Sequence, residues 1–320
     1  MGVVALRNES GAVVNLVASM IVRDEADRYL RACLDHLLEF CDSVRILDDG
    51  STDSFREVDW YGDDRVEVLR NDTPMFMQHE GRARQALLDW TFAADPSHVL
   101  AIDADEFVSD GAKLRDVCER DRSRGSIPSV WILTMREVWT ATPEELWTRE
   151  DGLWGPRACP LLYSLPARRN SYRWRIANRA AAPGREPQAV AALRQRARKT
   201  DVDILHFGWA NIADRADRYA RYEGDGFGHN PDHITSIMWG DDRVTQEPHE
   251  WPEALAPYAA DIVERAQLGA DTAPVRKVVV PPATFVPAAE VVGGSDFAVF
   301  RKHPDGRWVG VKWDGTIETS

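Results

Sequence analysis

The chain has 320 residues, of which 44% are hydrophobic and 28% charged, and its formal net charge is −13. This length allows one large domain, or a domain with a smaller lobe, and the composition is typical of a soluble globular protein. The acidic balance argues against nucleic acid as the main partner, because proteins that bind it usually present a basic face.

The cysteines and the N-terminal residues indicate a cytoplasmic protein. Cys33, Cys41, Cys118 and Cys159 show no metal-ligand spacing and are expected to be free thiols in a reducing compartment. The N-terminus lacks the basic start and apolar core of a signal peptide. The longest apolar stretch, residues 13–22, is too short to span a bilayer, so no transmembrane segment is expected.

The N-terminal part has the pattern of a strand, a helix and a second strand. Residues 13–22 form an apolar run that predicts a buried strand, and Asp24 is placed to cap the helix that follows. Apolar side chains over residues 30–41 recur at helical spacing, and residues 44–47 predict a second strand. This order favours a βαβ unit with a parallel sheet and a right-handed crossover.

Two acidic turns follow strands of this predicted sheet. The run Asp48-Asp49-Gly50-Ser51-Thr52-Asp53 follows the second strand. After a third strand at residues 65–69 and a helix at 79–94, the strand at 98–102 leads into Asp103-Ala104-Asp105-Glu106. Open α/β sheets bind ligands at the carboxyl ends of their strands, so both turns are expected to border one crevice.

Crowded carboxylates repel one another, and a hard divalent cation relieves that repulsion. The second acidic turn therefore predicts a metal that carries a polyphosphate. The structural alternatives are a solvated acidic turn at residues 103–106 and an Asx-turn formed by Asp48 and Asp49 with Gly50.

The order of these motifs resembles that of GT-A glycosyltransferases, in particular family 2. The resemblance is carried by Val22-Arg23-Asp24-Glu25 after the first strand, by the run at 48–53, and by Asp103-Ala104-Asp105-Glu106. A helix with Arg82 and Arg84 before the last of these also has counterparts in the family. The resemblance covers residues 13–110, resumes near 200–222, and implies a Rossmann-like, mostly parallel central sheet flanked by helices.

The resemblance also implies roles for single residues. Asp48 or Asp49 would contact the base and ribose of a nucleotide, Asp103 would lie near the ribose, and Asp105 would bind the metal that bridges two phosphates. Arg84 would belong to the same nucleotide site. These roles agree with the chemistry, because carboxylates accept hydrogen bonds from ring N–H groups and ribose hydroxyls.

A second motif lies at residues 204–209, where a short strand presents His206 ahead of a helix that Asn211 would cap. It resembles the family's His-x-Gly segment, which implies that His206 completes the metal site. An imidazole ligand favours Mn²⁺ over Mg²⁺. The alternative is a histidine with an ordinary polar role at the end of a strand.

The acceptor side is expected between residues 111 and 270. Trp154 lies between glycines and is the best candidate for a sugar or acceptor platform, because aromatic faces suit sugar binding. Most of the neighbouring tryptophans are expected to be packing residues; the group comprises Trp131, Trp139, Trp147, Trp154, Trp174 and Trp209. An inverting transferase needs a carboxylate base. Asp151 is chosen from the pairs Glu144-Glu145 and Glu150-Asp151, although a solvated charged loop explains either pair.

The remaining segments complete the predicted domain organisation. Helices are expected at residues 111–126, 188–199 and 251–268, and strands at 130–133, 275–280 and 297–313. An arginine-rich stretch at 168–179 would bind phosphate or pair with the excess acid, and a glycine-rich loop covers 223–230. Residues 1–270 would form the GT-A domain, with a nucleotide-binding half at 12–110 and an acceptor half at 111–270. Residues 271–320 would form a small β-rich extension that covers the sheet, binds a partner or supports a homodimer.

The leading hypothesis is a metal-dependent, inverting glycosyltransferase. It would move a sugar from a UDP- or GDP-linked donor to a hydroxyl of a glycan, a protein or a small metabolite. A sugar-nucleotide nucleotidyltransferase is the first alternative, and it would release pyrophosphate. A non-catalytic carbohydrate-binding protein is the second, and its affinity for glycans would depend on neither nucleotide nor metal.

Overall fold

The structure is a computed structural model that describes eleven stretches of the chain. These are residues 14–57, 60–92, 94–121, 130–150, 155–164, 197–224, 236–237, 244–267, 297–302, 308–312 and 317–319. The chain divides into two compact units, Met1–Arg215 with Gly240–Ala270, and Ala216–Trp239 with Asp271–Ser320. In the described part of the chain, no helix is long and apolar enough to cross a membrane.

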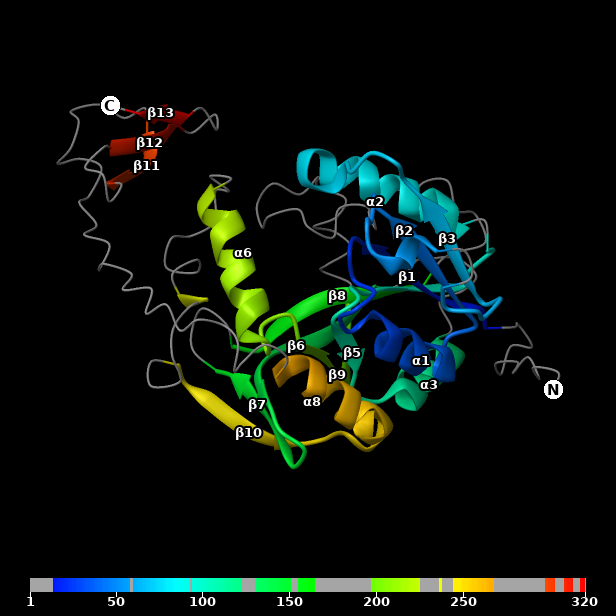
Figure 1. Ribbon diagram of the computed structural model, residues 1–320. Helices are drawn as coiled ribbons and strands as arrows, with labels where there is room; N and C mark the ends of the chain where they lie inside the picture. Colours follow the sequence, from blue (N-terminus) through cyan, green and yellow to red (C-terminus); the bar gives the residue numbers. More distant parts are fainter. Residues whose placement is uncertain are drawn as a thin grey trace. The chain divides into compact units, whose positions relative to one another are not determined.

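The first unit contains one sheet whose N-terminal half is parallel. Strand β1 (Leu16–Val22) lies between β2 (Ser43–Asp48) and β4 (His98–Ala101), and β3 (Val66–Arg70) follows β2 at the edge. The predicted βαβ unit is confirmed, because helix α1 (Leu30–Phe40) connects two neighbouring parallel strands (Figure 1). The carboxyl ends of β1, β2 and β4 consequently meet at one edge of the sheet.

The second half of the sheet is mixed and was only partly predicted. Its described strands are β5 (Glu106–Val108), β6 (Val130–Ala141), β7 (Glu145–Arg149), β8 (Arg157–Ser164), β9 (Arg198–His206) and β10 (Gln246–Glu250). Strand β8 joins β4 to β6 by antiparallel pairing, whereas β6 and β9 are parallel. Strand β9 also pairs antiparallel with β5, directly after the second acidic turn.

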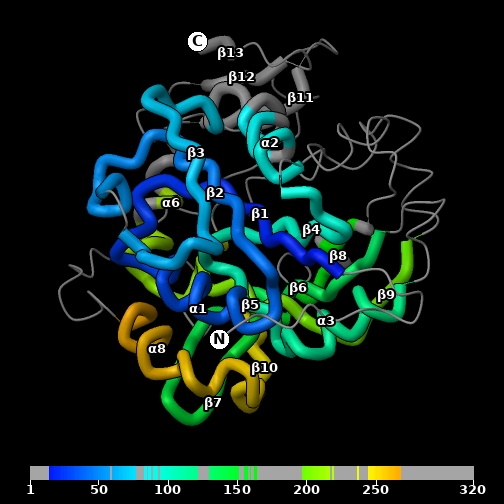
Figure 2. Tube along the Cα trace, turned by 90° about the vertical axis from the view of Figure 1, so that its right-hand side faces the viewer, coloured from blue at the N-terminus to red at the C-terminus, as the bar shows by residue number. Residues whose placement is uncertain are grey.

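Helices cover both faces of the parallel half. Helix α2 (Phe76–Phe92) lies on one face, and α1 with α3 (Gly111–Arg120) lies on the other (Figures 1 and 2). The alternation along β2 explains this arrangement, since Val44 and Ile46 join the core on the α1 side while Leu47 packs with Leu87 of α2. The predicted α/β class with flanking helices is confirmed.

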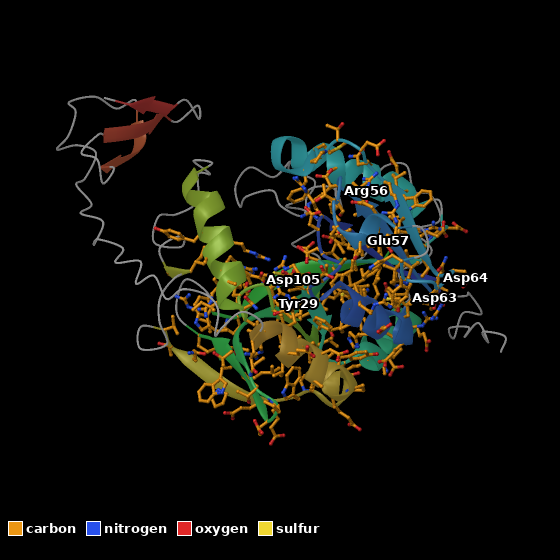
Figure 3. All side chains as sticks on the ribbon, in the orientation of Figure 1. Tyr29, Arg56, Glu57, Asp63, Asp64 and Asp105 are labelled. Atoms are coloured by element: carbon orange, nitrogen blue, oxygen red, sulfur yellow. The ribbon has the colours of Figure 1, made fainter. Side chains whose placement is uncertain are left out.

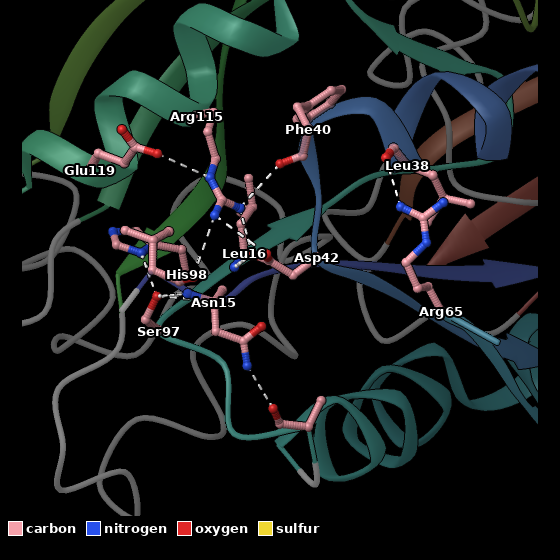
Figure 4. Close-up of polar contacts among 12 residues, drawn as sticks. Asn15, Leu16, Leu38, Phe40, Asp42, Arg65, Ser97, His98, Arg115 and Glu119 are labelled. Carbon is pink, nitrogen blue, oxygen red and sulfur yellow. Dashed lines mark hydrogen bonds and ion pairs between the residues drawn. The ribbon is translucent and has the colours of Figure 1, made fainter. Parts of the chain in front are cut away.

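The amino ends of the strands are fixed by polar contacts (Figure 4). The Asp42 carboxylate accepts hydrogen bonds from the Leu16 backbone N–H at 2.7 Å and from Arg115 of α3. The Asn15 side chain donates to the Ala94 carbonyl oxygen at 2.8 Å, and the Asn15 backbone N–H donates to the Ser97 hydroxyl. These contacts tie the amino ends of β1 and β4 to the neighbouring loops and to α3.

Three sequence-based expectations were wrong in detail. Asp24 does not cap α1, which begins at Leu30 with Tyr29 as its N-cap residue. The helix predicted over residues 188–199 is contradicted at its end, because Arg198 and Lys199 lie in β9, where pairing with β6 outweighs local helical propensity. The helix predicted over 251–268 is a 3₁₀ turn, Glu253–Tyr258, followed by α8 (Ala259–Gln267).

Several expectations fall wholly or partly outside the described residues. They include the arginine-rich stretch at 168–179, the strand at 275–280, and most of the glycine-rich loop at 223–230. The second unit, described by itself, contains the antiparallel strands β11 (Phe297–Lys302), β12 (Trp308–Lys312) and β13 (Ile317–Thr319). These three strands lie within residues 271–320, where the β-rich extension was predicted.

Candidate active site

The second acidic turn, residues 103–106, is stabilised by the side chain of its last residue, Glu106. The Glu106 side chain accepts a hydrogen bond from the Asp103 backbone N–H at 2.9 Å, and the Glu106 N–H donates to the Asp103 carbonyl oxygen at 3.1 Å. Glu106 therefore closes the turn, while Asp103 is half-buried and Asp105 is 6% exposed. The Phe207 N–H donates to the Asp105 carbonyl oxygen at 2.8 Å, which ties the turn to the end of β9.

His206 lies at this point because three strands are in register. It is paired with Glu106 of β5 on one side and with Glu137 of β6 on the other. Its Nε2 lies 3.5 Å from Oδ1 of Asp105, and its Nδ1 makes a short contact with Oε2 of Glu137. The two motifs singled out in the sequence, 103–106 and 204–209, thus meet at the carboxyl end of the sheet.

The charges around His206 are tightly coupled. Burial alone would lower the pKa of His206, but the neighbouring Glu137 and Asp105 carboxylates outweigh it and raise that pKa well above its usual value. Burial would raise the pKa of Glu137, but His206 and then Arg157 outweigh it, so this pKa is lowered. Both carboxylates therefore favour the protonated form of His206, with Glu137 on the Nδ1 side of the ring and Asp105 on the Nε2 side.

A second layer of charge surrounds Asp105. Arg28 donates to Glu25 at 2.6 Å and to Asp214 at 3.0 Å, and Asp214 also accepts two hydrogen bonds from Arg265. Burial would lower the pKa of Arg28, but Glu25, Asp105 and Asp214 raise it. Asp214 is thus held between two arginines from distant parts of the chain.

Tyr29 lies close to Asp105 (Figure 3), and the charge of Asp105 contributes to the raised pKa of the tyrosine, of which burial is the main cause. Its ring packs beside Phe207 at 5.9 Å and beneath the guanidinium group of Arg265. Its hydroxyl is buried and has no hydrogen-bond partner among the described residues.

The first acidic turn lies at the same edge of the sheet but is largely occupied by protein contacts. The Asp48 carboxylate is buried, accepts from Arg70 at 2.9 Å and accepts from the Ser51 N–H at 2.8 Å. The Asp49 carboxylate accepts from the Met75 and Phe76 N–H groups at the start of α2. Both side chains therefore shape this loop and the first turn of α2.

Gly50 is required by this geometry. Its φ is +80°, and a Cβ at this position would lie 2.9 Å from side-chain atoms of Pro74. Asp24 belongs to the same region, because its carboxylate accepts from the Thr52 N–H at 2.6 Å and from the Thr52 hydroxyl. The Asp24 carboxylate, which the sequence analysis expected to cap α1, thus joins the loops that follow β1 and β2.

Other predicted site residues lie elsewhere or outside the described residues. Arg84 is on α2, with its guanidinium group 5.4 Å from the centre of the Phe76 ring. The predicted base Asp151 and the predicted platform Trp154 both lie outside the described residues. Trp139 is buried between the guanidinium groups of Arg149 and Arg215, which agrees with the expected packing role for most of the tryptophans.

Glu150, the described member of the Glu150-Asp151 pair, belongs to a polar group on β7 and β10. Its Oε1 accepts from the Thr148 hydroxyl at 2.8 Å, and Thr148 also contacts Nε2 of His249. Within the described ranges, Glu150, Glu247 and His249 are the one group of three acidic, histidine or cysteine side chains whose possible ligand atoms lie within 4.8 Å of one another. Asp105 and His206, by contrast, offer two possible ligand atoms to a cation rather than three.

An open pocket of about 530 Å³ lies at the opposite ends of β6 and β9. Its lining includes Trp131, Lys199 and Asp201, which precede Glu137 and His206 on the same two strands by five to seven residues. At about 3.3 Å per residue the pocket is roughly 20 Å from the His206 site. It is therefore separate from the acidic turns.

Among the comparisons with known proteins, only those with solved structures find similar proteins. No protein-family model matches the chain, and no curated protein matches it. The crystal structure of residues 1–349 of TarS from S. aureus is similar at 15% identity and a TM-score of 0.39, over 70% of this chain and 69% of that one.

Two further structures have lower scores. HddC from Yersinia pseudotuberculosis, complexed with GMP-PN, is similar at 11% identity and a TM-score of 0.35, over 61% of this chain and 94% of that one. Mannose-1-phosphate geranyltransferase from Thermus thermophilus is similar at 10% identity and a TM-score of 0.32, over 61% and 74% respectively. At identities this low, the chemistry rests on the residues of this chain.

Proposed function

We propose that the protein is a glycosyltransferase that takes its sugar from a nucleotide-diphosphate donor and uses a divalent cation, Mn²⁺ rather than Mg²⁺. The observation that carries this proposal is the meeting of Asp105 and His206 at the carboxyl edge of the sheet. The donor is a UDP- or GDP-linked sugar, and the acceptor is a hydroxyl of a glycan, a protein or a small metabolite.

The two side chains suit such a cation. The Asp105 oxygen and the His206 nitrogen are 3.5 Å apart, so both can contact one cation at a metal–ligand distance of about 2.1 Å. Mg²⁺ and Mn²⁺ are often held by one or two protein ligands together with substrate phosphates, and an imidazole favours the softer ion. When bound, the cation would offset the negative charge of the departing diphosphate.

The surrounding residues of the chain support the same use. Asp103, which is half-buried beside Asp105, would accept hydrogen bonds from ribose hydroxyls. Arg28 adds positive charge next to Asp105 and is fixed by Glu25 and Asp214. We assign Asp48 and Asp49 to building the nucleoside loop, because their carboxylates already accept hydrogen bonds from the protein.

The acceptor side of the proposal keeps its sequence-based candidates. Asp151 would take the proton from the acceptor hydroxyl, as inversion requires, and Trp154 would offer the sugar an aromatic face. Arg84 would reach the donor from α2.

Calorimetric titration of UDP and of GDP, with and without Mn²⁺, tests the donor site. The wild type should bind one diphosphate in a Mn²⁺-dependent manner. Asp105→Asn should weaken that binding by about 100-fold, since it removes a charged ligand worth roughly 3 kcal/mol. Asp201→Asn is the matched control, because Asp201 is an exposed carboxylate at the far end of β9, paired with Lys113, and should leave the affinity unchanged.

The alternatives predict different results. A nucleotidyltransferase would release pyrophosphate from a nucleoside triphosphate and a sugar phosphate. A carbohydrate-binding protein would bind glycans with an affinity that ignores both nucleotide and Mn²⁺. Absence of diphosphate binding in every condition would reject the proposed donor site.

A further inference from the structure

Glu137 is a fully buried carboxylate that neither acidic turn contains. It lies near the middle of β6, its side chain is 0% exposed, and it is in register with His206 on the neighbouring parallel strand. A buried carboxylate is costly unless it is paired, so its retention at this position needs a physical reason.

The Glu137 carboxylate contacts two charged side chains, and the buried one is His206. One carboxylate oxygen contacts Nδ1 of His206, and the other lies 2.6 Å from Nη2 of Arg157. Arg157 is about half exposed, whereas the Glu137–His206 contact is enclosed by the sheet. With Nδ1–H donated to Glu137, the ring presents Nε2 on its opposite side, and Nε2 faces Asp105.

We propose that Glu137 is a positioning residue, which holds His206 in the orientation and tautomer that present Nε2 to the cation shared with Asp105. This inference rests on the proposed function, because the cation belongs to it. Carboxylates that orient ligating histidines in this way typically improve metal affinity 10- to 100-fold. Here the orientation is also fixed by backbone pairing, since both side chains stand on adjacent strands of one sheet.

A purely structural Glu–His pair makes a different prediction. It would stabilise the fold, but its loss would leave the affinity for a cation unchanged in molecules that remain folded. The buried pair of His98 and Asp121 provides the control, because its Nε2–Oδ2 distance is 3.4 Å and both side chains are 0% exposed. His98 and Asp121 lie at the amino end of β4 and directly after α3, respectively.

The test compares Glu137→Gln with Asp121→Asn in the full chain. Glutamine keeps the size of the side chain and removes its charge, and thermal unfolding without metal identifies any loss of fold. Free Mn²⁺ is measured by electron paramagnetic resonance during titration. We expect Glu137→Gln to weaken Mn²⁺ binding by at least tenfold and Asp121→Asn to change it less than twofold.

A second readout reports the ring directly. The spin-echo spectrum of bound Mn²⁺ should show a nitrogen coupling in the wild type that His206→Ala removes. Glu137→Gln should weaken this coupling at saturating Mn²⁺, which a merely structural role would leave intact. If Glu137→Gln folds too poorly to be measured, Glu137→Asp serves instead, and its shorter side chain should give the same loss of coupling.

The outcomes separate the two proposals. Wild-type Mn²⁺ binding that Asp105→Asn weakens, but that Glu137→Gln leaves unchanged in affinity and coupling, overturns the role of Glu137 alone. A wild type that binds no Mn²⁺ overturns both that role and the metal dependence of the proposed function.

Discussion

The two ends of the sheet each contain a buried histidine beside a carboxylate, but the surroundings of the two pairs differ. At the amino end, Asp121 lies 3.4 Å from His98 and 3.2 Å from Arg198, and the Ser97 hydroxyl contacts Nδ1 of His98. Protein groups thus approach both ring nitrogens of His98, whose side chain is 0% exposed. We therefore interpret the His98–Asp121 pair as structural, because its contacts join β4, the residue after α3 and β9.

At the carboxyl end, protein groups also approach both ring nitrogens. Nδ1 of His206 is in short contact with Glu137, and Nε2 lies 3.5 Å from Asp105, a distance close to the 3.4 Å of the His98 pair. The two histidines differ in their position instead. His206 is 9% exposed and adjoins the acidic turn after β4. We therefore treat His206 as a candidate ligand because it is partly exposed beside an acidic turn, whereas the side chain of His98 is 0% exposed.

The largest expected effect comes from removing each histidine in turn. If His206 is the cation ligand that we propose, His206→Ala should weaken Mn²⁺-dependent diphosphate binding by about 100-fold, which corresponds to roughly 3 kcal/mol. His98→Ala should leave that affinity within about twofold, provided that circular dichroism shows it folded at the assay temperature. Calorimetry measures both variants, and equal losses would mean that the two ends of the sheet do not differ in function.

The same comparison can be made in stability. Asp121→Asn should lower the free energy of unfolding by about 2 kcal/mol, because it weakens charged hydrogen bonds in a fully buried setting. Urea denaturation of the variant and the wild type measures the difference. The exposed pair of Lys113 and Asp201 supplies the control, since solvent screens it and Asp201→Asn should change the unfolding free energy far less than Asp121→Asn. Similar losses in the two variants would contradict the role of the buried pair.

The sequence predicted one side of the site well. Apolar runs identified β1, β2 and β4, and a parallel sheet brings their carboxyl ends to one edge, so the location of Asp105 followed from local pattern. The resemblance to GT-A enzymes added His206, which the structure places next to Asp105. Both signals are short motifs at strand ends, so recognising the strand in the sequence also locates the motif at the edge of the sheet.

Glu137 could not be predicted in the same way. It follows Arg136 in a twelve-residue strand of mixed polarity, and its importance depends on its register with β9, far along the chain. Strand β10 was missed for a related reason, because Pro248 and charged residues disfavour a strand, yet a strand at the edge of the described sheet tolerates them. The functions of Asp24 and Asp49 were likewise decided by loops that meet only in three dimensions.

A smaller effect would sharpen the contrast between the two acidic turns. Asp49→Ala should lower the free energy of unfolding by about 1–2 kcal/mol, because it removes the carboxylate that accepts from the Met75 and Phe76 N–H groups. Asp49→Asn should recover part of the loss, since the asparagine side chain has the same length and its amide oxygen can still accept from these N–H groups. Denaturant unfolding measures both, and an alanine variant as stable as the wild type would contradict this role.

The smallest effect concerns His36, a third buried histidine that differs from those at the two ends of the sheet. Its Nε2 lies 2.9 Å from the Val108 carbonyl oxygen, and the half-exposed Glu39 and the ring of Tyr258 face it. Burial lowers the pKa of His36 and outweighs the Val108 carbonyl and Glu39, which both raise it.

The sign of the pH effect follows from this lowered pKa. Below about pH 6.5 the unfolded chain gains a proton that the folded protein does not accept, so the stability from neutral His36 is present above that pH and is lost as the pH falls towards the folded pKa. His36→Gln keeps a donor for the Val108 carbonyl and should flatten this part of the pH dependence. Unfolding free energies between about pH 5 and pH 7 should fall more steeply in the wild type, by at most about 1.4 kcal/mol per pH unit. Parallel curves for the two proteins would show that His36 protonates equally in the folded and unfolded states. In that case His36 would not contribute to the pH dependence of stability, and only His98 and His206 would remain to be compared.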